Sequence, residues 1–487
     1  MSSVDAVVLG ADIEGLVAAA ALARAGRAVL LLEQGDVIGG VAAGEEFHPG
    51  YRSAGVVHEV GCLRRKHLGF LELEGHGLAW SDGDAWTRLP AAQGADAEAL
   101  ARWREFIARV RPWVNELIDS PPPAAAQPAA ADLLGLAKTS FSLRRLGERD
   151  MFELLRIASL PLADWMGECF EDEALRVALA APALLGTVLG PRAPGTAALL
   201  CLRACLAGPE PLGGPAALAD ALAAACRRLG VGMRTGQRVA RLRVEAGSVR
   251  GVELEGESIA ATRVLSAWSP GRTLLELVEP RHLPTSLEQV ARNWRSRGSV
   301  AAIRWALSKP PELPERTCTA RSLNELEQSA DHLKFGTMCE QPWLDVFVPS
   351  ATQASLAPKG HAVVSALVHG MPHRLEQGWN EDARSRLATA ALHELERICP
   401  GARETVVATD LLTPIDLERR FGQDGGHLFQ GELALDQLWI QRPAPRLSRY
   451  ATPIEGLYLC GSSSHPGGPF YGGAGALAAR ALLSADR

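Results

Sequence analysis

The stretch DAVVLGADIEGLVAAAALARAGRAVLLLE, residues 5–33, decides the fold. Its apolar segments 5–9 and 28–32 predict two short buried strands. The small-residue run 16–25 between them predicts a helix that ends at Gly26. Two apolar strands joined by a helix indicate a parallel sheet that is covered on both faces. We therefore expect an α/β fold built on a parallel sheet.

The turn between the first strand and the helix has the pattern of a Rossmann-type dinucleotide-binding loop. Such a loop holds a pyrophosphate at the helix N-terminus, where free N–H groups and the helix dipole attract negative charge. Gly10 and Gly15 take the first and third glycine positions of the GxGxxG fingerprint. Glu33 takes the position of the acid that binds a ribose hydroxyl. The unit predicts a bound dinucleotide, and a β-α-β unit that binds nothing is the alternative.

Asp12 stands where the fingerprint has its second glycine, so the loop is degenerate. At an effective dielectric constant of about 20, two unit charges 4 Å apart repel by about 4 kcal/mol, or roughly three decades of affinity. Glu14 adds a second carboxylate to the same turn. An arginine, a metal ion or an outward rotamer would relieve the repulsion. Otherwise the loop no longer binds a dinucleotide.

Glycines elsewhere extend this candidate site. Gly39 and Gly40 follow Glu33 closely and allow a turn beside a cofactor, although an ordinary turn is the alternative. Residues 465–475 form a glycine loop before a predicted helix at 476–483. This second helix N-terminus can face a phosphate or the edge of a flavin ring, or it can be a packing loop.

The remainder of the 487-residue chain is long enough for a second domain. Helical periodicity is expected at 97–118, 132–207, 215–229 and 381–398, and the Pro/Ala-rich segment 119–131 predicts a linker or mobile loop. Short runs at 231–255, 263–267 and within 299–412 predict strands.

Composition narrows the class of protein. Hydrophobic residues make up 47% of the chain and the net charge is -6, which fits a globular protein and not a nucleic-acid binder. Nine cysteines without a CxxC pair predict free thiols and a reducing, cytoplasmic location. We expect no signal peptide and no membrane span. A peripheral membrane contact and a partner protein are left open.

Few residues stand out as catalytic candidates. We find no Ser-His-Asp order, no HExxH motif and no clustered metal ligands, so no metal site is expected. His427 and His465 lie beside glycine loops and are the histidines most suited to chemistry. Glu432 and Asp436, four residues apart, are expected to be structural rather than a catalytic pair.

The sequence resembles the phytoene-desaturase-like branch of the FAD-dependent amine oxidase superfamily, and most of all the pyridine nucleotide-disulfide oxidoreductase domain-containing protein 2 group. The resemblance runs nearly end to end. It is carried by the segments 5–33, 37–50, 211–218, 234–239, 269–274, 412–422, 425–443 and 456–468. A single β-α-β unit with a C-terminal glycine loop also favours FAD over NAD.

The resemblance implies two interleaved domains. A discontinuous Rossmann-type FAD-binding domain would comprise residues 1–75, 208–298 and 445–487. An α+β substrate domain, with a mixed sheet and helices, would comprise residues 76–207 and 299–444. The resemblance further implies an FAD-dependent oxidoreductase, with an organic and apolar small molecule undergoing desaturation, isomerisation or oxidation.

The resemblance also implies how FAD lies. The backbone at Val239 would meet the adenine part, and Gly461 and residues 472–475 would lie along the flavin. The cofactor-binding residues are then Gly10, Asp12, Gly15, Glu33, Gly39, Gly40, Val239, Gly461, Gly472 and Gly475.

The chain departs from the family pattern in three loops. The family's GAGxNG is here Gly10-Ala-Asp-Ile-Glu-Gly15, and its last loop differs over 467–475. In the family's run GGNxFHGE, His427 replaces asparagine and Gln430 replaces histidine. We therefore take His427, Gln430 and His465 as candidate catalytic residues. The alternative is a non-redox descendant with lost or weakened FAD binding, which acts as a partner or scaffold protein or in non-redox catalysis.

Overall fold

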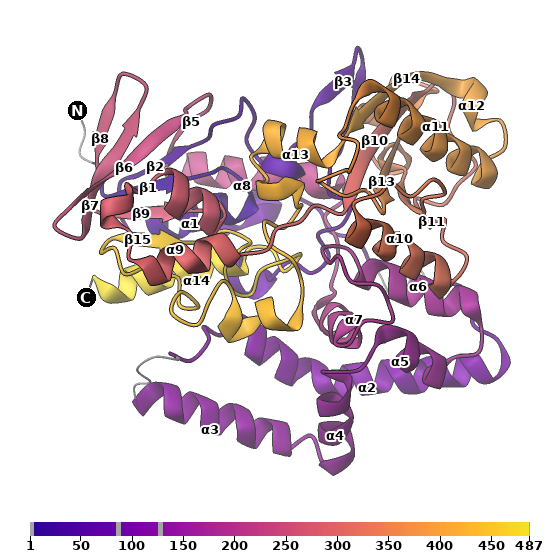
Figure 1. Ribbon diagram of the computed structural model, residues 1–487, viewed down its shortest axis with the longest axis horizontal. Coiled ribbons are helices and arrows are strands. Elements are labelled where there is room, and N and C mark those ends of the chain that lie inside the picture. Colours follow the sequence, from indigo (N-terminus) through magenta and orange to yellow (C-terminus); the bar gives the residue numbers. More distant parts are fainter. Residues whose placement is uncertain (1–3, 84–88, 125–129, 487) are drawn as a thin grey trace.

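The computed structural model describes residues 4–83, 89–124 and 130–486 (Figure 1). Two large sheets organise these residues. One has the strand order β15-β9-β1-β2-β5 and the other the order β11-β12-β13-β10-β14. In Figure 1 the first sheet lies on the left and the second at the upper right, with a layer of helices below. The expected α/β fold with a Rossmann-type parallel sheet is confirmed.

Every pairing in the first sheet is parallel. Its strands are β1 (Ala6–Leu9), β2 (Val29–Leu32), β5 (Gly232–Arg234), β9 (Val264–Ser266) and β15 (Leu457–Leu459). β1 and β2 are buried along their whole length, which is why their sequences are continuous apolar runs. A separate antiparallel sheet carries the predicted hairpins, as β6 (Val239–Glu245), β7 (Ser248–Leu254) and β8 (Ser258–Ala260).

Three helices cover the parallel sheet near the fingerprint. α1 (Ile13–Arg24) contacts both α8 (Gly214–Arg228) and α14 (Gly473–Ala485). The small residues of α1 allow this close approach. A Cβ atom on Gly475 would lie 2.2 Å from the carbonyl oxygen of Glu14, so only glycine fits there. α1 begins three residues earlier than predicted, because Asp12 caps it.

The second large sheet is antiparallel throughout, although the sequence predicted a mixed sheet. A parallel pair needs a long crossover, usually a helix. The connection from β12 to β13 has only two 3-10 turns, η8 (Pro349–Ala351) and η9 (Ala354–Leu356), so the chain turns straight back. The strands are β10 (Val300–Leu307), β11 (Arg316–Cys318), β12 (Leu344–Phe347), β13 (Ala362–His369) and β14 (Val406–Leu412).

Helices fill the rest of the molecule. Beside the antiparallel sheet lie α10 (Leu323–Phe335), α11 (Glu381–Ile398), α12 (Ala402–Thr405) and α13 (Pro414–Phe421), and α9 (Thr285–Asn293) lies nearer the parallel sheet. The lower layer comprises α2 (Gly94–Asp119), α3 (Ala130–Arg144), α4 (Glu148–Ile157), α5 (Leu162–Cys169), α6 (Glu173–Ala183) and α7 (Thr196–Leu206). The predicted linker 119–131 separates α2 from α3, and its residues 125–129 lie outside the described ranges.

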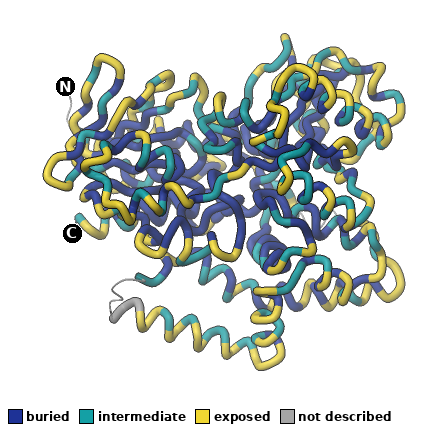
Figure 2. Tube along the Cα trace, viewed as in Figure 1, coloured by how far each residue is buried: buried dark blue, intermediate teal, exposed yellow. Residues whose placement is uncertain are grey.

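Burial is continuous through the middle of the molecule, where the two large sheets and the C-terminal segment meet (Figure 2). The strands of the parallel sheet come from the predicted segments 1–75, 208–298 and 445–487, and those of the antiparallel sheet from 299–444. The domain boundaries themselves stay a prediction. All nine cysteines are free, as expected. No helix within the described ranges is both long and apolar enough to cross a membrane.

Candidate functional site

Asp12 is the N-cap of α1, and both its carboxylate oxygens have partners. Oδ1 accepts the N–H of Gly15 at 2.9 Å, and Oδ2 accepts the side-chain amide of Gln430 at 3.2 Å. Burial raises the pKa of Asp12 to about 7, and the charge of Glu33 adds to this rise. The Asp12 carboxyl is therefore stabilised by two amide N–H partners, which differ from the arginine, metal ion or outward rotamer considered from the sequence. Among the described residues no arginine pairs with Asp12.

Glu14 joins α1 to the last helix. Its Oε1 accepts the N–H of Gly472 and its Oε2 accepts the N–H of Gly475, each at 2.7 Å. These two N–H groups belong to the first turn of α14, so a side chain of the protein occupies this helix N-terminus. Glu14 is 2% exposed. Burial raises its pKa to about 8.

Glu33 lies at the end of β2, as predicted, but both its oxygens are engaged. Oε2 accepts the N–H of Ala11 at 2.7 Å and Oε1 accepts the N–H of Gly35 at 2.8 Å. Burial raises the pKa of this carboxyl. The acid that the fingerprint assigns to a ribose hydroxyl is thus bonded to the protein backbone instead.

The space between these groups is small. A cavity lined by Asp12, Glu14, Gly39, Gln430 and Tyr471, among others, has a volume of about 10 Å³. That is room for about one water molecule, whereas pockets for organic ligands usually exceed about 300 Å³. As folded here, the loop does not fit a pyrophosphate, because carboxylates already occupy both helix N-termini.

The predicted glycines fall into two groups. The N–H of Gly39 donates to the carbonyl of Ala11 at 2.7 Å, and a Cβ on Gly40 would lie 3.1 Å from the Cβ of Asp12. These two glycines, with Gly10, Gly15, Gly472 and Gly475, surround the fingerprint loop. Gly461 packs on the backbone of Ala267, and Val239 is buried in a different core. Neither lines the small cavity.

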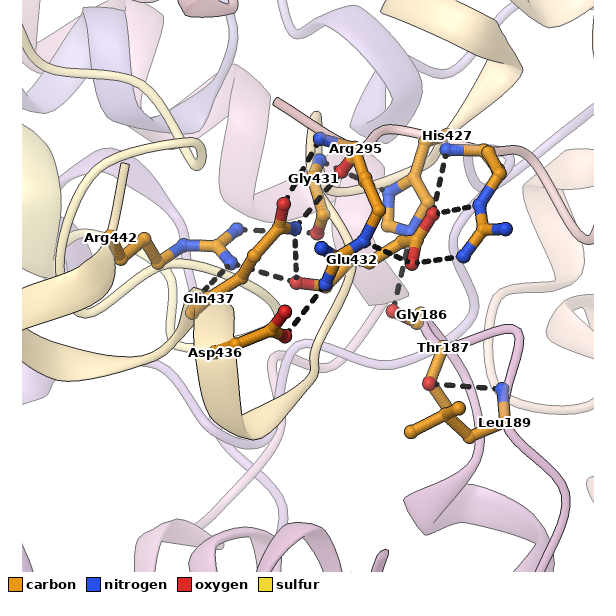
Figure 3. Close-up of polar contacts among 11 residues, drawn as sticks. Gly186, Thr187, Leu189, Arg295, His427, Gly431, Glu432, Asp436, Gln437 and Arg442 are labelled. Atoms are coloured by element: carbon orange, nitrogen blue, oxygen red, sulfur yellow. Dashed lines mark hydrogen bonds and ion pairs between the residues drawn. The ribbon is translucent and has the colours of Figure 1, made fainter. Parts of the chain in front are cut away.

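His427 is buried and holds its own loop together (Figure 3). Its Nδ1 accepts the N–H groups of Phe429 at 3.1 Å and Gly431 at 3.3 Å. Its Nε2 lies 3.2 Å from the carbonyl oxygen of Gly186, so the neutral ring carries its proton on Nε2. Burial lowers the pKa of His427 to about 4. These contacts favour a structural role, and its catalytic role stays a prediction.

Gln430 and His465 lie in different surroundings. Gln430 has a left-handed backbone, with φ of 54°, and contacts Asp12 at the small cavity. His465 is fully buried, and its Nε2 lies 3.1 Å from the carbonyl oxygens of both Ile118 and Ser120. Burial lowers its pKa to about 4. Of the three catalytic candidates, only Gln430 lines the small cavity.

Arg442 is a buried residue that sequence reasoning missed. Its guanidinium donates to the carbonyl oxygens of Gly431, Glu432 and Gln437 (Figure 3). It also donates to the carbonyl oxygen of Ser462. Burial lowers its pKa to about 9. Its partners lie between 5 and 20 positions away from it in the sequence, so no local pattern identifies it.

Glu432 and Asp436 do not face each other as a pair. The carboxylate of Glu432 is bound by Arg295 and Arg297, and Asp436 binds Arg295 at 2.6 Å (Figure 3). Both acids therefore fix arginines, which agrees with the structural role expected for them.

A larger cleft is lined in part by Asp424 and Gly425, which precede His427 in the same loop. Its volume is about 660 Å³. Three acidic residues line it, namely Glu276, Glu418 and Asp424. The cationic residues that line it are Arg272, Arg292, Arg295, Arg297, Lys334 and Arg374. This cleft could not be predicted from the sequence, because its cations come from segments that only the fold brings together.

Comparisons with known proteins give a consistent family. The family described as flavin containing amine oxidoreductase matches residues 88–483, and an NAD(P)-binding Rossmann-like domain matches residues 8–63. Mouse pyridine nucleotide-disulfide oxidoreductase domain-containing protein 2 is 31% identical over 98% of this chain and 93% of its own length. A phytoene desaturase (neurosporene-forming) of Cereibacter sphaeroides is 27% identical over 56% of this chain and 53% of its own length.

Solved structures give the same fold. Cyclohexylamine oxidase from Brevibacterium oxydans aligns over 100% of both chains, with a TM-score of 0.56 and 16% identity. Putrescine oxidase bound to putrescine aligns over 100% of this chain and 99% of its own, with a TM-score of 0.59 and 16% identity. At this level of identity the likeness shows the architecture alone.

Proposed function

This chain belongs to the flavin containing amine oxidoreductase family, in which FAD is the cofactor, and from this premise we propose that it oxidises an organic small molecule with an apolar body and an acidic group. In such enzymes the flavin carries the redox chemistry, and the protein binds and orients the reactants. The reaction type, whether desaturation, isomerisation or oxidation, stays a prediction.

The observation that supports this substrate is the charge of the 660 Å³ cleft. Six arginines and lysines line it against three acids, but Arg292, Arg295, Arg297 and Lys334 already pair with acids of the protein. Arg374 forms no ion pair with a described residue, and arginine is the side chain best suited to a carboxylate. Apolar side chains complete the lining: Val188, Leu275, Ala291, Trp294, Leu333 and Pro372. They would cover the apolar body that the family resemblance predicts.

The cleft is also connected to the fingerprint loop. Asp424 and Gly425 line the cleft, and the same loop continues to Gln430, which contacts Asp12. A molecule in the cleft would therefore lie one loop away from the predicted cofactor site. This arrangement supports placing the substrate there.

Decanoate and decanol are suitable probes, because they share an apolar chain and differ in charge. We expect decanoate to raise the Tm of the full-length protein more than decanol does, and Arg374→Ala to reduce the effect of decanoate. Arg374 is exposed in the cleft, so its replacement should not unfold the protein. Arg281→Ala, an exposed arginine outside the cleft, is the control. Equal shifts with both probes would refute the acidic group.

A non-redox descendant is the second candidate function. The closed fingerprint loop favours it, since the small cavity leaves about 10 Å³. An exposed apolar surface on α3 and α4 would suit a partner protein, and it comprises Leu133, Leu134, Phe141, Phe152 and Leu155. Substrate-dependent loss of the visible flavin absorbance, in protein loaded with FAD under nitrogen, would exclude this candidate.

A further inference from the structure

We propose that this protein reaches its native fold without flavin because the carboxylates of Asp12 and Glu14 take the places of the cofactor's phosphates, and that FAD binds only when both carboxylates leave. The inference rests on FAD being the cofactor of the proposed function. Beyond that function, it states that the carboxyl groups of Asp12 and Glu14 occupy the two helix N-termini of the fingerprint loop.

The first anion sits at the N-terminus of α1. Asp12 Oδ1 accepts the N–H of Gly15, which is one of the groups that a bound phosphate would use. The Gln430 amide holds the other oxygen. The carboxylate is therefore fixed on both sides, and an outward rotation breaks two hydrogen bonds.

The second anion sits at the N-terminus of α14. Glu14 binds two N–H groups of that helix, at 2.7 Å each, which is the arrangement that a phosphate oxygen pair would take. The position is enclosed, since Glu14 is 2% exposed and the two helices touch at Gly475. One side chain thus satisfies the amides that the family fold offers to a cofactor.

The neighbouring contacts are filled in the same way. Glu33 bonds to the backbone of Ala11 and Gly35 and is not free for a ribose. The Trp268 ring covers Gly10, since its Nε1 lies 2.9 Å from where a Cβ on that glycine would be. The Cζ atom of Arg272 lies 3.9 Å from the ring centre of the same tryptophan, in a cation–π contact. Entry of FAD therefore requires a rearrangement of the loop, beyond a change of one rotamer.

The test compares FAD affinity with the stability of the flavin-free protein. The full-length wild type, Asp12→Gly and Glu14→Gln would be stripped of flavin, titrated with FAD by equilibrium dialysis, and melted with and without FAD. Asp172→Gly is the matched control, because Asp172 is an acidic N-cap too, bonded to the N–H of Ala174 at 2.8 Å, but on α6. Glu14→Gln keeps the size of the side chain, which protects the fold.

We expect the flavin-free wild type to unfold cooperatively and to bind FAD weakly. Asp12→Gly and Glu14→Gln should each bind FAD about tenfold more tightly or better, because glycine makes neither hydrogen bond of Asp12 and the glutamine amide can accept only one of the two N–H groups that Glu14 binds. Each should also melt at a lower temperature until FAD is added. Asp172→Gly should melt lower without any change in FAD affinity.

Two results would overturn the inference. One is a wild type that is purified with one firmly held flavin per chain. The other is a pair of folded variants whose FAD affinity equals that of the wild type. Either result leaves the proposed substrate untouched. Conversely, failure of decanoate to bind the cleft would refute the proposed substrate and leave the closed loop standing.

Discussion

Asp12 and Glu14 are carboxyl groups whose pKa values, about 7 and about 8, lie far above the ordinary range near 4. Burial is the main cause for both. The groups that face them are themselves acids with raised pKa values, and an acid supplies no positive charge at any pH: Glu33, Tyr450, Cys460 and Tyr471. The folded protein therefore holds these two protons more tightly than the unfolded chain does.

This difference in proton binding makes the stability depend on pH. A carboxyl with a raised folded pKa contributes stability below its unfolded value near 4, and this stability is lost as the pH rises through 7 to 8. We expect the free energy of unfolding to fall between pH 6.5 and pH 8, and to fall less in Glu14→Gln. Urea unfolding measures it. Glu72→Gln, at an exposed acid, is the control and should keep the pH dependence of the wild type. If the free energy of unfolding of Glu14→Gln depended on pH as that of the wild type does, the raised pKa of Glu14 would be refuted.

His427 allows a test between structure and catalysis. Replacing it by alanine leaves the N–H groups of Phe429 and Gly431 without their partner, whereas the carbonyl of Gly186 still accepts the N–H of Leu433. We expect His427→Ala to lose about 1–3 kcal/mol of stability per unsatisfied buried group. His393→Ala, at an exposed histidine, is the control and should be neutral. A variant of wild-type stability that has lost turnover would restore the catalytic assignment.

At the scale of elements, the contact between α1 and α14 decides whether the fingerprint loop can form. A Cβ on Gly475 would lie 2.2 Å from the Glu14 carbonyl oxygen, so the helices must separate if this glycine is replaced. We expect Gly475→Ala to cost about 1–3 kcal/mol or more in urea unfolding, as overpacked cores do.

Gly167 provides the opposite case within the same experiment. It lies in α5, and a Cβ there would meet no atom within 4 Å. Gly167→Ala should therefore stabilise the protein by about 0.5–1 kcal/mol, because alanine favours helix. If both alanine variants behaved alike, the close packing of α1 on α14 would be wrong.

At the scale of the whole molecule, the sequence predicted the elements better than the site. The β-α-β unit was identified because strand, glycine turn and helix follow one another locally within residues 5–33. The closure of the fingerprint loop was not predicted, because Glu14 bonds to Gly472 and Gly475, which lie more than 450 positions away in the sequence. The cationic cleft was missed for the same reason. Fold-level contacts of this kind leave no periodic or spaced pattern in a sequence.

The order of synthesis adds a consequence to the bond between Glu14 and α14. A nascent chain makes α1 early, but its partner α14 comes from residues 473–485. Until those residues emerge from the ribosome, the side of α1 that packs on α14 stays exposed and Glu14 lacks its two amide partners. Exposed apolar surface of this kind attracts chaperones and promotes aggregation. The hydrogen bonds of Glu14 to α14 would therefore be among the last contacts of the fold to form.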